Sequence, residues 1–158
     1  MSILISDKAN AQLGISAPTA SFEVKIAEIL DLAITSGTTN TFEFNTIAQI
    51  DAGIEVPNAV TLTYKSNKPW FVNISADSPN FTGSSSTPMP CSVLMFKLNG
   101  SGSYIPLSTT PSSLSGTSAL KNPRGAASIG VDYKISPGYS YDPANDYGLV
   151  ISYSISNQ

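Results

Sequence analysis

The chain has 158 residues, of which 41% are hydrophobic and only 12% are charged, and its formal net charge is −3. This length predicts one domain with or without an extended arm, and the 8 basic residues are so scattered that we expect neither nucleic acid nor an anionic membrane as a partner. Histidine is absent, which excludes the Ser-His and Cys-His pairs of common nucleophilic enzymes.

The chain begins with residues 1–20, which we interpret as an N-terminal arm or a residual signal segment. The tripeptide ANA at 9–11 fits a signal-peptidase site with cleavage before Gln12, and such an ending resembles those of exported proteins of some Gram-negative bacteria. The apolar stretch before it is short and is interrupted by Asp7 and Lys8. Two interpretations stay open, namely the tail of a longer signal peptide and a mature arm.

Residues 21–158 show apolar side chains at every second position in many short runs, which is the pattern of half-buried β-strands. The first run, FEVKIAEILDLAI at 22–34, predicts two strands with a kink near Ala27. Further strands are predicted at 42–44, 60–65, 70–76, 93–98, 129–135 and 149–155, and long loops at 78–90 and 106–127. About eight strands of this length predict a single all-β antiparallel sandwich, Ig-like in size.

The only tryptophan, Trp70, lies in the stretch KSNKPWFVNISA at 65–76. It shares one face of its predicted strand with Val72 and Ile74, and each strand of a sandwich must bury one face. We therefore interpret Trp70 as a core side chain. The alternative, an exposed platform for a ligand, stays open.

The stretch YDPANDYG at 141–148 contains a candidate metal site. Asp142, Asn145 and Asp146 place oxygen ligands within five positions, and calcium takes six to eight such oxygens, often from one loop. Asp-Pro and Asn-Asp also form ordinary turns before a strand, so a turn is the competing interpretation. We expect no other cofactor.

Tyrosines crowd the same region, at Tyr139, Tyr141 and Tyr147. Tyrosine rings in a loop can stack on sugar rings while their hydroxyls find polar partners, so these residues, with Trp70, are the candidate site of a glycan-binding module. Alternatively, they pack over the open end of the sandwich.

We expect the protein not to be an enzyme. The sequence has no glycine-rich phosphate loop, no C-x-x-C and no paired-carboxylate motif, and the single Cys91 heads an apolar strand, where a buried structural thiol is expected. No stretch is long and apolar enough to span a bilayer.

Two stretches carry a resemblance to known proteins. The ending PGYSYDPANDYGLVISYSISNQ resembles that of spore-coat-U-like and other pilin-like secreted sandwiches of bacteria, and TFEFNTIAQIDAG followed by VTLTYKSNKPWFVNISA is similar to secreted bacterial Ig-like surface modules. The similarity covers residues 22–155 in pattern. It implies a structural protein of the extracellular surface of a Gram-negative bacterium: a pilus or fimbrial subunit that polymerises or adheres, with copies of itself or other surface proteins as partners.

A physical route to such assembly is strand donation, because a sandwich with an unpaired edge can accept a strand from a neighbour. In residues 1–20 the apolar residues are spaced for alternate pockets, so we predict this segment as the donor: Ile3, Ile5, Leu13 and Ile15. The competing hypothesis is a glycan-binding, lectin-like sandwich.

Overall fold

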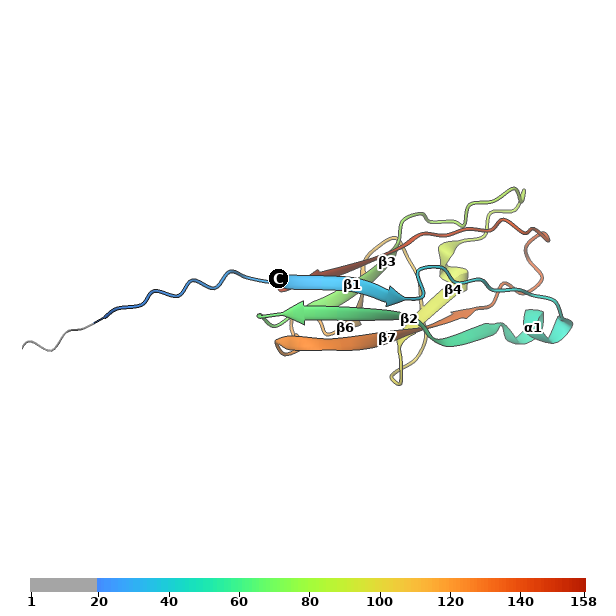
Figure 1. Ribbon diagram of the computed structural model, residues 1–158. Helices are drawn as coiled ribbons and strands as arrows, with labels where there is room; N and C mark the ends of the chain where they lie inside the picture. Colours follow the sequence, from blue (N-terminus) through green and yellow to red (C-terminus); the bar gives the residue numbers. More distant parts are fainter. Residues whose placement is uncertain (1–19) are drawn as a thin grey trace, which may run out of the picture.

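Alternating apolar runs form the strands of two sheets in the computed structural model, which describes residues 20–158. In chain order the elements are β1 (Leu30–Ser36), α1 (Ile47–Ala52), β2 (Ile54–Ser66), β3 (Phe71–Ala76), the 3-10 helix η1 (Cys91–Val93), β4 (Leu94–Leu98), β5 (Ile105–Pro106), β6 (Ser112–Ser115), β7 (Gly125–Ile135) and β8 (Ile151–Ser156). Within the described residues, eight strands pair antiparallel in a five-stranded sheet, β1-β2-β7-β4-β5, and a three-stranded sheet, β6-β3-β8. The expected all-β sandwich is confirmed (Figure 1).

The core lies between the two sheets and is built from the alternate apolar positions that the sequence predicted. Seven of its side chains expose 1% or less of their surface: Leu62 of β2, Val72 and Ile74 of β3, Phe96 of β4 and Val131 of β7, together with Trp70 and Leu107. Burial of one such side chain stabilises the fold by roughly 1.5–3 kcal/mol, so these residues explain why the two sheets stack. None of the helices within residues 20–158 is both long and apolar enough to cross a membrane.

Trp70 closes the core at the end of the sandwich where β1 begins. Only 1% of it is exposed, its ring centroid lies 3.9 Å from that of Tyr64, and its indole Nε1 donates a hydrogen bond of 2.9 Å to the carbonyl oxygen of Pro123. A backbone bridge to Asn122 holds it in place on the other side. Trp70 is therefore a core side chain, and it does not form an exposed platform.

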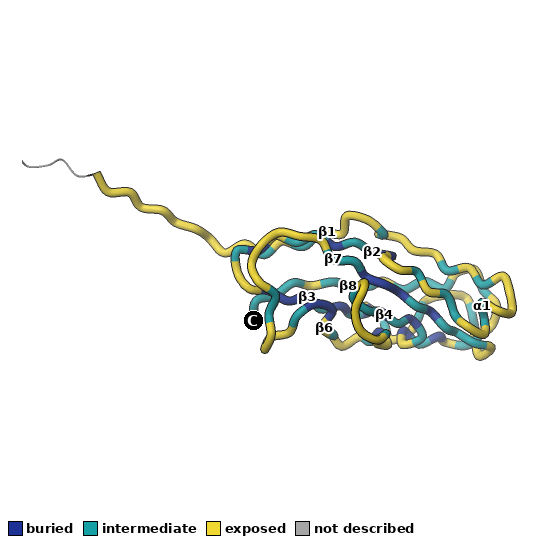
Figure 2. Tube along the Cα trace, turned by 90° about the horizontal axis from the view of Figure 1, so that it is seen from below, coloured by how far each residue is buried: buried dark blue, intermediate teal, exposed yellow. Residues whose placement is uncertain are grey.

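The structure differs from the sequence-based prediction at the first alternating run. Residues 22–26 form no strand; they are extended and belong to an arm that runs from 20 to 29 and leaves the body (Figure 2). Residues 42–44 are also extended, but they have no backbone partner within the described residues. Alternation marks a segment that suits a sheet, and a strand forms only where a neighbouring backbone supplies the hydrogen bonds.

Two features of the fold lay outside the prediction. Strand β6 lies within the stretch 106–127 that was expected to be a long loop, where Ser residues hide the alternation, and the two-residue strand β5 lies at the start of that stretch. Helix α1 begins at a capping box, in which Thr46 accepts from the backbone N–H of Gln49 and the side chain of Gln49 accepts from that of Thr46. The pattern Thr-x-x-Gln was the available signal for this helix.

Gly37 ends β1 and sends the chain across the open side of the sandwich. Its φ is +77°, and a Cβ at this position would lie 1.9 Å from the carbonyl oxygen of Ala59. Only glycine fits such a position without moving the backbone. The turn sets the course of the next segment, residues 38–45, along the groove described below.

Candidate functional site

The arm exposes three large apolar side chains at alternate positions. Phe22 is 92% exposed, Val24 80% and Ile26 81%, while Glu23 and Lys25 between them form an ion pair of 3.2 Å with each other. The arm projects away from the sandwich at the end where β1 begins, near the C-terminus (Figures 1 and 2). Exposed apolar side chains that share one face are typical of interaction sites.

An open groove of about 1060 Å³ lies between the two sheets on the side of β1 and β8. One rim of the groove is the free edge of β8 together with the residues that precede β8. The other rim is the segment that follows β1. Its apolar lining comes from these two rims, from β1, β2, β4 and β7, and from the loop between β3 and η1: Ile34, Phe42, Phe44, Val60, Phe81, Met89, Leu94, Tyr133, Ile135, Tyr141, Tyr147, Leu149, Val150, Ile151 and Tyr153. This volume is at the upper end for small-molecule pockets and is large enough for a short peptide segment.

Both rims of the groove carry backbone groups without a ladder partner in the described part of the chain. Strand β8 pairs only with β3 there, so its other side is a free edge. Opposite it, residues 40–45 run extended, with Phe42 and Phe44 packed against the core and Glu43 and Asn45 exposed. Free edges of this kind are the surfaces to which an additional strand binds.

Two tyrosines bring polar atoms into the floor of the groove. The hydroxyls of Tyr133 and Tyr153 lie 2.5 Å apart and share a hydrogen bond across the two sheets. Burial raises the pKa of both phenols, that of Tyr153 to about 12, so both stay neutral. Apolar side chains can therefore bind against the floor without burying a charged group.

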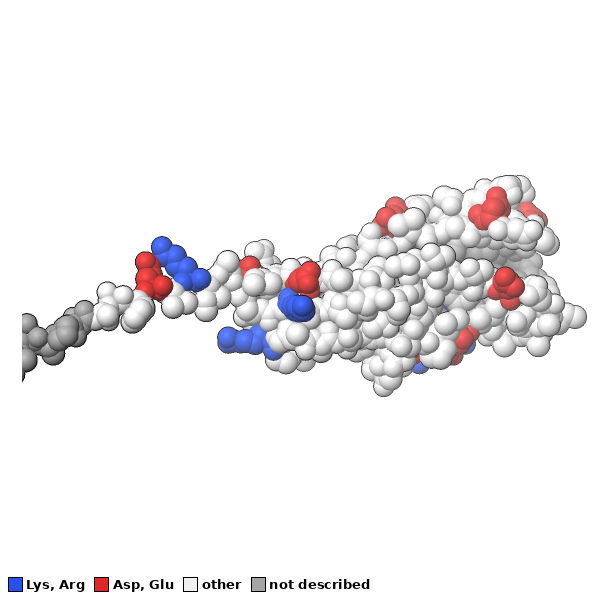
Figure 3. Space-filling model, in the orientation of Figure 1, with Lys and Arg blue, Asp and Glu red and all other residues white. Residues whose placement is uncertain are grey.

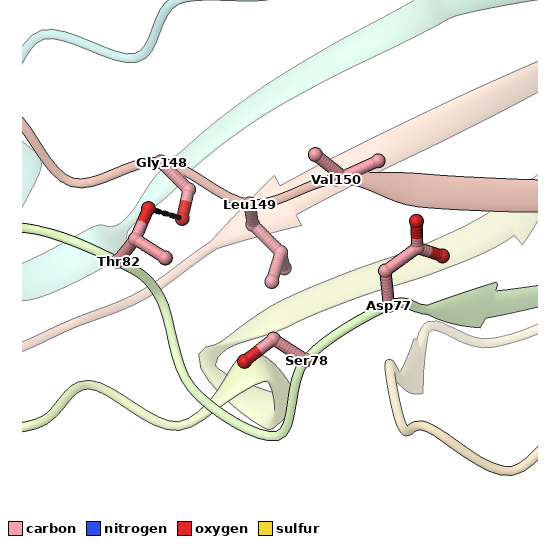
Figure 4. Close-up of a pocket in the computed structure, with 6 residues that line it drawn as sticks. All are labelled: Asp77, Ser78, Thr82, Gly148, Leu149 and Val150. Atoms are coloured by element: carbon pink, nitrogen blue, oxygen red, sulfur yellow. Dashed lines mark hydrogen bonds between the residues drawn. The ribbon is translucent and has the colours of Figure 1, made fainter.

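The wall formed by Gly148, Leu149 and Val150 separates the groove from a smaller pocket of about 400 Å³ (Figure 4). Thr82 holds this wall through two backbone hydrogen bonds to Gly148, each 2.8 Å long. Figure 4 shows the side chain of Leu149 directed toward the loop that carries Ser78. The smaller pocket thus depends on a wall whose position is fixed by β-bridge hydrogen bonds.

The residues proposed for calcium hold two loops together. Asp142 accepts hydrogen bonds from the hydroxyls of Ser86 and Thr87, at 3.0 and 3.1 Å, and Asp146 accepts from the backbone N–H and hydroxyl of Ser84, at 2.8 and 3.1 Å. Asn145 lines the groove, as Asp142 does. Within residues 20–158 no three or more Asp, Glu, Cys or His side chains gather into a metal-binding group, and the calcium site stays a prediction.

The tyrosines proposed for glycan binding do not share one surface. Tyr139 is 72% exposed and donates a hydrogen bond of 2.8 Å to Asp51, which raises its pKa. Tyr141 and Tyr147 line the groove, and the hydroxyl of Tyr147 donates to the carbonyl oxygen of Asp142 at 2.8 Å. Trp70 is in the core, so the structure brings two of the four residues, Tyr141 and Tyr147, to one groove.

The predicted donor residues Ile3, Ile5, Leu13 and Ile15 lie outside the described residues. The apolar arm side chains from Phe22 to Ile26 were assigned from sequence to a strand of the sandwich. Alternation is the same in a strand that pairs within its own sheet and in one that pairs with another molecule. The sequence pattern alone therefore does not distinguish these two cases.

Charge adds no further indication of a ligand. Figure 3 shows isolated acidic and basic side chains, with no extended patch of one sign on the face in view. No family model matches the sequence, and no curated protein is significantly similar to it. Function must therefore be inferred from the arm and the groove themselves.

Proposed function

We propose that the protein is a structural subunit of an extracellular surface layer or filament, in which the arm of one copy adds a strand to the groove of the next. The observation that supports this most directly is the arm, where Phe22, Val24 and Ile26 are exposed at alternate positions. Insertion would cover these side chains and give the unpaired rims of the groove their hydrogen bonds. The pattern resemblance to pilin-like secreted sandwiches points the same way, toward adhesion or polymerisation at the cell surface.

The energetics favour assembly that depends on concentration. Burying each of the three apolar side chains contributes roughly 1.5–3 kcal/mol. This gain is opposed by the freedom lost on association, which costs about 4 kcal/mol or more. We therefore expect exchange between free and assembled copies.

The first test compares two substitutions in the arm. Val24→Asp places a charge on the face that would enter the groove, and Lys25→Ser changes the next position, on the opposite face. Sedimentation velocity over a range of concentrations should show that Val24→Asp raises the concentration for half-assembly at least about tenfold, since an unpaired charge resists burial. Lys25→Ser should behave as the wild type.

Both side chains are exposed in the free chain, so neither substitution disturbs the folded body. A wild-type protein that stays monomeric at every concentration would contradict assembly through the arm.

A glycan-binding module is the second candidate. Tyr141 and Tyr147 line the groove beside the polar side chains of Asn145 and Asp142, and aromatic rings next to hydrogen-bonding groups suit sugar rings. A glycan array, read with and without calcium, tests this function. Reproducible binding that is lost in Tyr141→Ala would support it, and an array without binding would not.

A further inference from the structure

The root of the arm is attached to the body by Asn67. Strand β2 ends at Ser66, which pairs with Leu30, and the chain then turns away. Asn67 donates its backbone N–H to the carbonyl oxygen of Ile29 at 3.2 Å, its Oδ1 accepts from the N–H of Ile29 at 2.9 Å, and its Nδ2 donates to the carbonyl oxygen of Ala27 at 2.7 Å. A carboxamide carries the donor and acceptor of a peptide group, so Asn67 extends the β1–β2 pairing beyond the end of β2.

Glu28 adds a second attachment between these two contacts. Its carboxylate lies 2.5 Å from Nζ of Lys68, and its other oxygen accepts a hydrogen bond from Nδ2 of Asn157. The arm root, residues 27–29, is therefore held to the end of β2, to the following turn and to the C-terminal segment. All of residues 20–29 are exposed, and within this range the hydrogen bonds and the ion pair to the body come from residues 27–29.

This clamp of Asn67 and Glu28 points the arm away from the groove of its own chain. The arm continues the line of β1 outward from its first residue (Figure 1), whereas the groove begins at Ile34, near the other end of β1, and extends along residues 37–45. The part of β1 from Leu30 to Ile34 separates the root from the groove by about 15 Å. To reach its own groove the arm would have to reverse at residues 27–29 and break these contacts, whereas the groove of another copy requires no reversal.

We infer that the clamp selects a second copy of the chain, and not the chain's own groove, as the site where the arm docks. This inference rests on the proposed docking of the arm in a groove. It assigns Asn67 a positioning role, because Asn67 contacts only the root and is remote from the apolar side chains that would enter the groove. Loss of the clamp should therefore produce closed monomers at the expense of assemblies.

The direction of the arm can be measured in the full chain at a concentration low enough to keep it monomeric. Spin labels at Ser21→Cys and Ser36→Cys lie about 50 Å apart if the arm continues the line of β1, since fifteen extended residues separate them. Replacing Asn67 by Ala should add a population at about half that distance or less. Labelling of the unsubstituted chain checks that the buried Cys91 does not react.

The assembly equilibrium gives the second readout. Because each of the two side-chain hydrogen bonds of Asn67 is worth about fivefold in an equilibrium, Asn67→Ala should raise the concentration for half-assembly by about five- to twenty-five-fold. Asn80→Ala, at an exposed asparagine in another loop, is the matched control and should leave it unchanged.

The two proposals fail differently. If Val24→Asp prevents assembly while Asn67→Ala assembles like the wild type and keeps the long interspin distance, the clamp inference is wrong and arm docking stands. If Val24→Asp leaves assembly unchanged, arm docking itself is wrong, and the inference about Asn67 fails with it.

Discussion

At the scale of single residues, Trp70 shows how one side chain ties two segments that are distant in sequence. Its ring fills the end of the core against Tyr64, and its one polar atom is satisfied by the carbonyl oxygen of Pro123. A buried indole without this acceptor would leave an N–H unpaired in an apolar environment, which costs free energy. The packing of the ring and its hydrogen bond therefore make separate contributions to the free energy of unfolding.

Substitution of Trp70 should separate them. Trp70→Ala should lower the free energy of unfolding by about 3–5 kcal/mol through loss of buried volume. Trp70→Phe retains a ring but leaves the oxygen of Pro123 without its donor, and it should cost about 1–3 kcal/mol. Urea unfolding measures both, with Leu120→Ala, at a residue 79% exposed, as the control. Equal effects of Trp70→Ala and Leu120→Ala would show that the indole is not packed.

At the scale of elements, Asp132 joins three neighbouring strands on the outer face of the five-stranded sheet. It lies on β7, and its Oδ1 accepts from the backbone N–H of Asn58 in the bulge of β2 at 2.7 Å and from Nδ2 of Asn99 after β4 at 2.6 Å. Nζ of Lys97 lies 3.6 Å from Oδ2. Only 3% of Asp132 is exposed, and Gly130 leaves room for Asn58, because a Cβ there would lie 2.1 Å from Oδ1 of Asn58.

The titration of Asp132 predicts part of the acid sensitivity. Desolvation by burial acts to raise its pKa, but the hydrogen bonds from Asn58 and Asn99 and the charge of Lys97 outweigh it and hold the pKa below the ordinary value of 3.8. A carboxyl whose pKa is lower in the folded state contributes its stability above the unfolded pKa, and that contribution is lost as the pH falls through the folded pKa.

Asp132→Asn should therefore be less stable than the wild type at neutral pH, and the difference should shrink as the pH falls below about 4. Urea unfolding over this pH range measures the effect. Asp31→Asn, at an exposed position of β1, controls for the general loss of negative charge. A stability difference that is independent of pH would contradict the role assigned to the ionised carboxylate.

At the scale of the whole molecule, the arm and the sandwich are separate parts of the chain. The core contains none of the side chains of residues 20–29, and the groove remains open without them. A ligand that binds the folded protein and not the unfolded chain raises the apparent stability in proportion to the logarithm of its concentration. The arm sequence itself should act as such a ligand.

The peptide ASFEVKI, residues 20–26, should raise the Tm of the Val24→Asp chain as the peptide concentration increases. At 100 times its Kd, the peptide should add about 2.7 kcal/mol to the free energy of unfolding. The same peptide carrying aspartate at the position of Val24 is the control, because it keeps length and composition otherwise. Equal effects of the two peptides, or none from either, would argue against a groove specific for the alternating apolar side chains. Calorimetry or thermal unfolding by circular dichroism provides the measurement.

The sequence by itself determined the fold class and most of the core. The alternation of apolar side chains is a local property, because neighbouring residues of an extended chain point to opposite faces, and it is readable at Leu62, Val72, Ile74 and Val131 without any knowledge of pairing. The same reasoning placed Trp70 inside.

Only the tertiary structure decided which alternating segments become strands. Residues 22–26 and 42–44 have the pattern of a strand, yet one became an arm and the other an unpaired rim, because a strand requires hydrogen bonds from a backbone far away in sequence. The groove likewise arises where residues 37–45 meet β8, more than a hundred positions apart. Side-chain alternation is local in the sequence, whereas backbone pairing is not, so the first could be predicted and the second could not.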